Sequence, residues 1–146
     1  MTKSARSIFV LWDSLFDTEL AVAITSRLRS EGVRVKIVGL YGRPCGGQHG
    51  IVLTPDLTLR QALTQIERCR YLFIPSDPFF LKKLSAEPRI QEIFLAATKS
   101  GAALAFGFIT PDKLEEIPFF HTLSSVRTIV DRSELDMLLA EILSDL

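Results

Sequence analysis

The stretch Gly101-Ala102-Ala103-Leu104-Ala105-Phe106-Gly107-Phe108-Ile109 decides the fold class of this sequence. It is an apolar run bounded by glycines and followed by Thr110-Pro111-Asp112. Such a run, lying behind a helical pattern, predicts a strand buried on both faces in the middle of a parallel sheet. Parallel sheets bind ligands outside the carboxyl ends of their strands, where a nucleophile is expected. Here Phe106, Gly107 and Phe108 occupy that turn, with no serine or cysteine among them.

Strand and helix patterns alternate along the rest of the chain. Short apolar runs predict strands at 8–11, 33–38, 51–53, 71–74 and 126–130, and the alternation in 33–38 is typical of an edge strand. Helix starts are predicted at Thr58 with Gln61, at Pro88, at Thr110 with Pro111, and at Ser133 with Asp136. We therefore expect an α/β fold with a three-layer, doubly wound, mostly parallel sheet of the flavodoxin-like type, with residues 1–146 forming one domain.

Composition limits the classes of function. The chain has 146 residues, with 17 basic and 17 acidic side chains, so it lacks the positive charge that nucleic-acid or anionic-membrane binding requires. Its apolar runs are too short to span a membrane, and the run after the basic start is too short for a signal peptide. The sequence predicts a cytoplasmic protein without nucleic-acid or membrane partners. Two cysteines do not indicate a disulfide framework.

The expected topology predicts which residues share a crevice. The first strand of a doubly wound sheet is usually central and lies beside the point where strand order reverses. The candidate crevice is lined by residues that follow the predicted strands: Asp13, Ser14, Glu19, Ser76, Asp77, Gly107 and Phe108.

Several motifs together resemble the DJ-1/PfpI family, relatives of the class I glutamine amidotransferases. Asp13-Ser14-Leu15-Phe16-Asp17-Thr18-Glu19-Leu20 is similar to the family's Asp-Gly-Phe-Glu-Asp-x-Glu-Leu. The family's segment that contains His-Gly-Ile-x-Val-x-Pro-Asp is similar to two stretches of this chain, Val38-Gly39-Leu40 and Gln48-His49-Gly50-Ile51-Val52-Leu53-Thr54-Pro55-Asp56. Ile74-Pro75-Ser76 stands where the family has Pro-Gly-Gly. The resemblance runs from about Ile8 to Ile109.

Departures from the family pattern bear on catalysis. The family's cysteine nucleophile falls on Gly107, which has no side chain to attack a carbonyl or be oxidised. Phe108 follows where relatives often carry histidine, and Ser76-Asp77 replaces the glycine pair that faces an oxyanion. The segment after Gly107 is also shorter than in typical relatives. The resemblance assigns Glu19 to the family's acidic residue, which here is either a pocket group or a helix first-turn acid favoured by the dipole.

Other reactive side chains have competing interpretations. Cys45 lies in a glycine-rich loop near Arg43 and His49 and is either a redox sensor or an inert surface thiol. Cys45 and His49 alone do not complete a metal site, and we expect no metal and no cofactor. Cys69 is expected to be a packing residue. His121 is either a general base brought to the crevice or a loop residue, and the pairs Phe79-Phe80 and Phe119-Phe120 are either buried or interface aromatics.

The sequence thus supports two functions. The first is a non-catalytic DJ-1/PfpI-like domain that acts by protein association, as a homodimer or as a regulatory or scaffolding partner. Family dimers pack around the first helix, which indicates Phe16, Leu20 and the loop 42–50 as contacts. The second is a small-molecule binder, or a hydrolase or glyoxalase-like enzyme, with a rebuilt pocket around Glu19. A cavity beside Gly107 would favour the second, and filling of that space by Phe106 and Phe108 would favour the first.

Overall fold

The computed structural model describes residues 6–41 and 45–145, apart from the side chains of Cys45 and Gln48. Its centre is a six-stranded sheet in the order β5-β2-β1-β6-β7-β8, in which every neighbouring pair is parallel. The strands are β1 (Ser7–Trp12), β2 (Val35–Gly39), β5 (Leu57–Thr58), β6 (Cys69–Ile74), β7 (Ala103–Gly107) and β8 (Val126–Ile129). This arrangement confirms the predicted α/β doubly wound fold.

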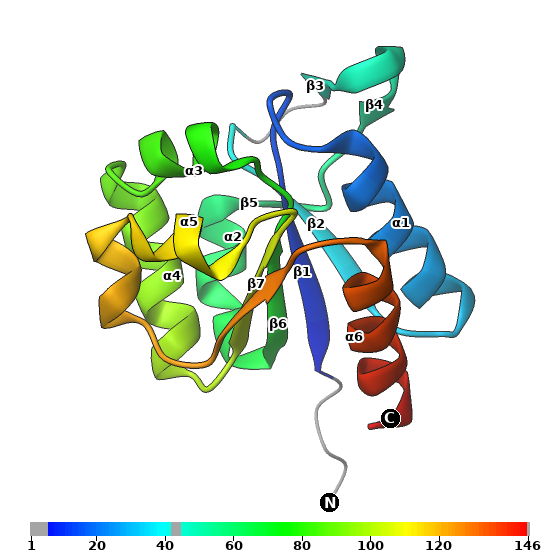
Figure 1. Cartoon of the computed structure of the whole chain (residues 1–146). Coiled ribbons are helices and arrows are strands. Elements are labelled where there is room, and N and C mark those ends of the chain that lie inside the picture. Colours follow the sequence, from blue (N-terminus) through cyan, green and yellow to red (C-terminus); the bar gives the residue numbers. More distant parts are fainter. Residues whose placement is uncertain (1–5, 42–44, 146) are drawn as a thin grey trace, which may run out of the picture.

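Helices cover both faces of the sheet, which makes three layers (Figure 1). Helices α1 and α6 pack together on one face, while α2 and α4 pack together on the other with α3 and α5. The helices are α1 (Thr18–Ser30), α2 (Leu59–Thr64), α3 (Pro78–Leu84), α4 (Pro88–Lys99), α5 (Pro111–Glu115) and α6 (Arg132–Ser144), with short 3-10 turns at Gln48–Gly50, Ile66–Arg68 and Pro118–Thr122. The predicted Thr58–Gln61 capping box is present.

Two local predictions were wrong. The strand predicted at 33–38 is not at the edge, because β5 pairs with β2 on its outer side. Helix α6 begins at Arg132 and is capped by Asp131, whose carboxylate accepts the Glu134 amide hydrogen, so Ser133 does not open it. Helix α5 begins where it was predicted, with Thr110 before it and Pro111 in its first turn, although the Thr110 side chain makes no capping bond. The segment after Asp77 forms the short helix α3.

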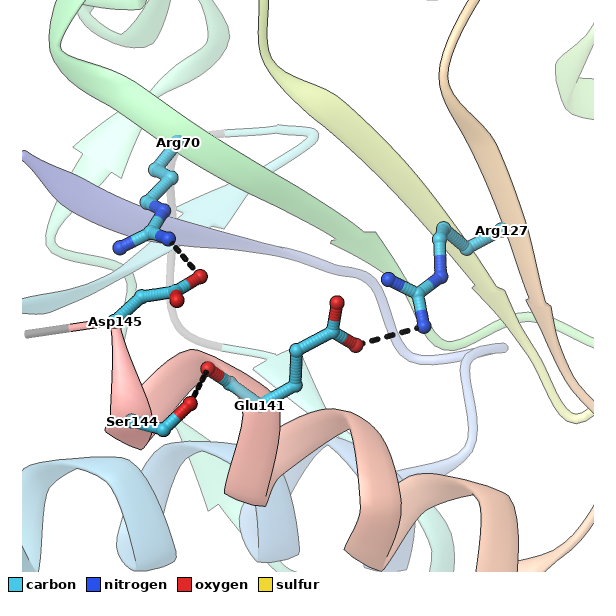
Figure 2. Close-up of polar contacts among 5 residues, drawn as sticks. All are labelled: Arg70, Arg127, Glu141, Ser144 and Asp145. Carbon is cyan, nitrogen blue, oxygen red and sulfur yellow. Dashed lines mark hydrogen bonds and ion pairs between the residues drawn. The ribbon is translucent and has the colours of Figure 1, made fainter.

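The last helix is held against the sheet by two ion pairs near its carboxyl end (Figure 2). Arg127 of β8 binds Glu141 at 2.9 Å, and Arg70 of β6 binds Asp145. The Ser144 hydroxyl donates to the Glu141 carbonyl at 2.9 Å within the same turn. The Arg127 guanidinium holds the pKa of the Glu141 carboxyl below its usual value. Both pairs lie at the amino edge of the sheet, away from the crevice predicted at the carboxyl edge.

A small antiparallel hairpin projects beyond the carboxyl edge of the sheet (Figure 1). It is formed by β3 (Cys45–Gly46) and β4 (Val52–Leu53). Gly47 follows β3 and packs so closely on the body of the protein that a Cβ there would lie 2.2 Å from the Thr18 hydroxyl and 2.7 Å from the Trp12 ring. Glycine is therefore required at Gly47, because only backbone fits between the hairpin and these two residues.

Candidate functional site

Parallel pairing brings the ends of β1, β6 and β7 to one edge of the sheet. Ile74 pairs with Phe106, and Gly107 pairs with Ile129 of the edge strand β8. Asp13 follows β1 and Ser76 follows β6 at the same edge. The residues of the predicted crevice therefore lie close to one another in the sheet. Whether they form one pocket depends on where their side chains point.

The position of Gly107 leaves no room for a side chain. A Cβ built there would lie 2.9 Å from the Ile129 Cβ and 3.3 Å from the Ile129 carbonyl oxygen. Carbon atoms in contact normally lie about 3.5–4.0 Å apart. The backbone of β8 is fixed at this point because the Ile109 amide donates to the Ile129 oxygen at 3.0 Å. The end of β8 thus occupies the space into which a residue at 107 would project.

The aromatic residues on either side of Gly107 pack into the hydrophobic core. Phe106 is fully buried and packs on Phe94 and Phe120, with ring centroids 5.8 Å and 4.8 Å away. Phe108 is half-buried and packs against the same hydrophobic core. Both rings therefore contribute to the packing of the domain.

Ser76 and Asp77 are engaged in starting helix α3. The buried Ser76 hydroxyl donates to the Asp77 carbonyl at 3.2 Å, and the Ser76 amide donates to the Ile74 carbonyl at 2.9 Å. The Asp77 carboxylate accepts the Phe80 amide hydrogen at 2.8 Å, as an N-cap residue does. The Ser76 amide is therefore already used within the chain and is not directed at an oxyanion.

Glu19 lies in the first turn of α1 and faces the hairpin. Its side chain is 68% exposed, and its carboxylate is 3.7 Å from the His49 ring nitrogen. It is thus associated with the 3-10 turn between β3 and β4, whereas Gly107 lies on β7 beside β8. The sequence predicts Glu19 and Gly107 in one crevice because both lie near the carboxyl ends of strands of the same sheet.

Two other acidic residues of the motifs stabilise local structure. Asp17 caps α1, since its carboxylate accepts the Leu20 amide hydrogen at 3.0 Å. Asp56 accepts the Ile37 amide hydrogen at 2.8 Å and a guanidinium hydrogen of Arg29 at 2.9 Å. These bonds join the segment before β5 to β2. Both carboxylates have a structural role that needs no ligand.

Neither described histidine nor the described thiol is placed for chemistry at Gly107. Cys69 begins β6 at the amino edge, and burial raises its pKa to about 12, against a smaller lowering effect of a backbone hydrogen bond from Phe9. The exposed His121 ring lies 2.9 Å from the Glu115 carbonyl oxygen. The side chain of Cys45 lies outside the described residues. Within 6–41 and 45–145 no group of three or more potential ligands forms a metal site.

A cavity that sequence reasoning missed lies at the ends of β1 and β2. Its volume is about 300 Å³, and it is lined by Trp12, Asp13, Ser14, Leu15, Gly39, Leu40 and Tyr41. Asp13 was among the predicted residues, but it was grouped with β6 and β7. Leu40 and Tyr41 were missed, although their place directly after the second strand was a signal for them, because parallel β1 and β2 end at the same edge.

Exposed apolar side chains form a rim around this edge of the sheet. We call Leu15, Tyr41, Ile51, Val52 and Phe79 the apolar rim. Leu15 and Tyr41 lie on connections that follow β1 and β2, Ile51 and Val52 lie on the hairpin, and Phe79 lies in the first turn of α3. The connections are joined to one another: Phe16 and Phe80 are in edge contact at 5.6 Å, and the Asp17 amide donates to the Pro75 carbonyl.

Comparisons with known proteins agree with this architecture. No protein-family model matches the sequence, and no curated protein sequence does. Solved structures match at TM-scores of 0.71 for Drosophila melanogaster DJ-1beta and 0.75 for the putative protease I from Bacteroides thetaiotaomicron. The chain has the fold of the DJ-1/PfpI superfamily.

The DJ-1/PfpI fold extends over nearly the whole chain. Drosophila DJ-1beta is 13% identical, and the match covers 97% of this chain and 90% of that one. The Bacteroides protein is 12% identical, with 97% and 99% covered. A mutant of a DJ-1 superfamily protein from Salmonella typhimurium matches with a TM-score of 0.70, 13% identity, and 95% and 91% covered. At these identities the likeness is one of fold, and the site must be argued from the residues of this chain.

Proposed function

We propose that this protein is a non-catalytic domain of DJ-1/PfpI-like fold that works by associating with another protein chain, in the first instance a second copy of itself. The packing at Gly107 is the main support for the absence of the family's cysteine-dependent chemistry. The resemblance to the family puts the nucleophile at this position, and here a Cβ would lie 2.9 Å from the Ile129 Cβ. A cysteine therefore could not be accommodated without moving β8, so the loss involves the backbone as well as the side chain.

The surroundings of Gly107 support the same conclusion. Glu19, the acidic partner that the resemblance assigns, is exposed and pairs with His49. The Ser76 amide is bonded to Ile74. The alternative of a glyoxalase-like enzyme or binder built around Glu19 has less support, because the Glu19 carboxylate is exposed and faces His49.

The apolar rim supports association. Large exposed apolar side chains that gather on one edge are a feature of protein interfaces. The contacts expected from family dimers need correction: Phe16 and Leu20 are buried inside the chain, so they cannot form the outer surface. Their exposed neighbour Leu15 and the hairpin residue Val52 take that place in the proposal.

Sedimentation velocity over a range of concentrations tests this proposal. We expect the wild-type protein to form a dimer, and the double variant Leu15→Ser with Val52→Ser to dissociate at least about tenfold more readily, which corresponds to roughly 1.4 kcal/mol. The matched control is Leu95→Ser with Met137→Ser, since these side chains are also exposed but lie on α4 and α6. A monomeric wild type, or equal weakening by both double variants, would contradict the proposal.

A further inference from the structure

Asp13 is a buried residue whose carboxylate is not used to hold the fold together. Asp13 is 7% exposed, and within the described chain its side chain has no hydrogen bond or ion pair, in contrast to Asp17, Asp56 and Asp77. Only its backbone carbonyl is used, as the acceptor of the Phe16 amide hydrogen. A carboxylate on a largely buried residue that has no protein partner can accept hydrogen bonds from an added donor, and charge-assisted hydrogen bonds of this kind are among the stronger ones.

The same carboxylate lines the cavity at the ends of β1 and β2. Its oxygens are not among the fully enclosed unsatisfied atoms of the described residues, so they retain contact with this hollow. At about 300 Å³ the cavity is at the small end of the range of ligand pockets. Asp13 therefore lines a space whose size suits a small molecule.

We propose that this cavity binds a small organic cation, with a protonated amine paired to Asp13. A carboxylate only accepts hydrogen bonds, so its complement is a donor with positive charge. Tyr41 lines the cavity and offers a ring for a cation, as it already does for Arg89, whose guanidinium carbon lies 5.9 Å from the ring centroid. Arg89 is itself paired with Glu87 at 2.9 Å, so it is not the cation that neutralises Asp13.

The remaining lining suits such a ligand. Ser14 adds a hydroxyl, and Leu15 and Leu40 give apolar walls for a short carbon chain. No lysine or arginine lines the cavity among the described residues, which leaves the carboxylate available to a cation and unfavourable to an anion. This inference concerns a site distinct from Gly107, but Leu15 and Tyr41 belong both to this cavity and to the apolar rim. Amine binding and dimerisation are measured by separate experiments, so the failure of one proposal can be distinguished from the failure of the other.

Nuclear magnetic resonance titration of the full chain tests the site with defined probes. Ethanolamine and putrescine are compared with ethylene glycol and 1,4-butanediol, which have similar chain lengths but lack the ammonium. We expect the amines to shift the amide signals of Asp13, Ser14 and Tyr41 with dissociation constants below about 10 mM, and the diols to leave them unchanged. Equal shifts with the diols, or no shift at these residues with about 50 mM of either amine, would overturn the inference.

Variants separate the carboxylate from general surface charge. Asp13→Asn keeps the shape of the side chain and is expected to weaken amine binding at least tenfold. The control Asp112→Asn removes an exposed carboxylate in the first turn of α5 and is expected to change nothing. Should Asp13→Asn fail to fold, Tyr41→Leu at an exposed position gives the second test, with an expected loss of at least threefold. Unchanged affinity in the folded Asp13 variant, or equal loss in the Asp112 control, would contradict the assignment.

Discussion

Replacing Gly107 by alanine adds one methyl group at the position on which the argument against catalysis depends. The new Cβ would be 2.9 Å from the Ile129 Cβ, roughly 0.6–1 Å closer than a normal carbon contact, and 3.3 Å from a backbone oxygen. Neither neighbour is the free end of a flexible side chain, and Gly107 and Ile129 are paired across the sheet. Relief therefore requires β8 to shift, and overpacking of this kind costs about 1–3 kcal/mol.

Part of that cost is offset, because the backbone entropy lost on folding costs about 0.5–1 kcal/mol less for alanine than for glycine. We expect Gly107→Ala to lower the free energy of unfolding by about 1–2 kcal/mol, which corresponds to about 2–8 °C in Tm for a domain of this size. Urea unfolding followed by circular dichroism measures it. The matched control is Gly46→Ala in β3, where the nearest atom to the new Cβ is Val52 Cγ2 at 3.8 Å. Its stability should stay the same or rise by up to about 1 kcal/mol, because the new methyl group meets no clash. A Gly107→Ala protein as stable as the wild type would refute the reasoning, since it would mean that the space beside β8 is open.

Three further outcomes are expected. Asp56→Ala leaves the Ile37 amide without its 2.8 Å acceptor and should cost about 1–3 kcal/mol in urea unfolding; a loss under about 0.5 kcal/mol would contradict this role. Burial raises the pKa of Cys69 to about 12, so its thiol should resist iodoacetamide at pH 8 in the folded protein and react when the protein is unfolded in urea. A thiol that is modified in the folded protein as fast as in urea would disprove its burial. Arg127 lowers the pKa of Glu141, so the contribution of this ion pair to stability is present above about pH 4.3 and is lost as the pH falls further. Between about pH 5 and 3, the Glu141→Gln variant should therefore lose less stability than the wild type. Parallel curves of stability against pH for the two proteins would rule this out.

Much of the fold could be predicted because its signals are local. The apolar run ending at Gly107 is the strand β7, and the Thr58–Gln61 spacing is a capping box because both partners lie in one helical turn. The interior position of β2 could not be predicted in the same way. The two-residue strand β5 pairs with it, and so short a segment carries no periodicity of its own.

The candidate site was less predictable because it depends on packing between distant segments. Spacing placed Asp13 and Glu19 at one edge, but it did not show that Asp13 is enclosed beside Tyr41 while Glu19 points to His49. The contact between Gly107 and Ile129 joins positions 22 residues apart, and its 2.9 Å separation follows from strand register. The absence of a thiol could be read from the sequence, whereas the absence of room for one required the structure.

Turnover of methylglyoxal, measured for the wild-type protein beside Glu19→Gln and Gly107→Cys, tests the central claim most directly. The account predicts no consumption above the buffer rate for any of the three, because the position of the nucleophile is closed by β8 and Glu19 faces the hairpin. Wild-type turnover that Glu19→Gln abolishes would contradict it.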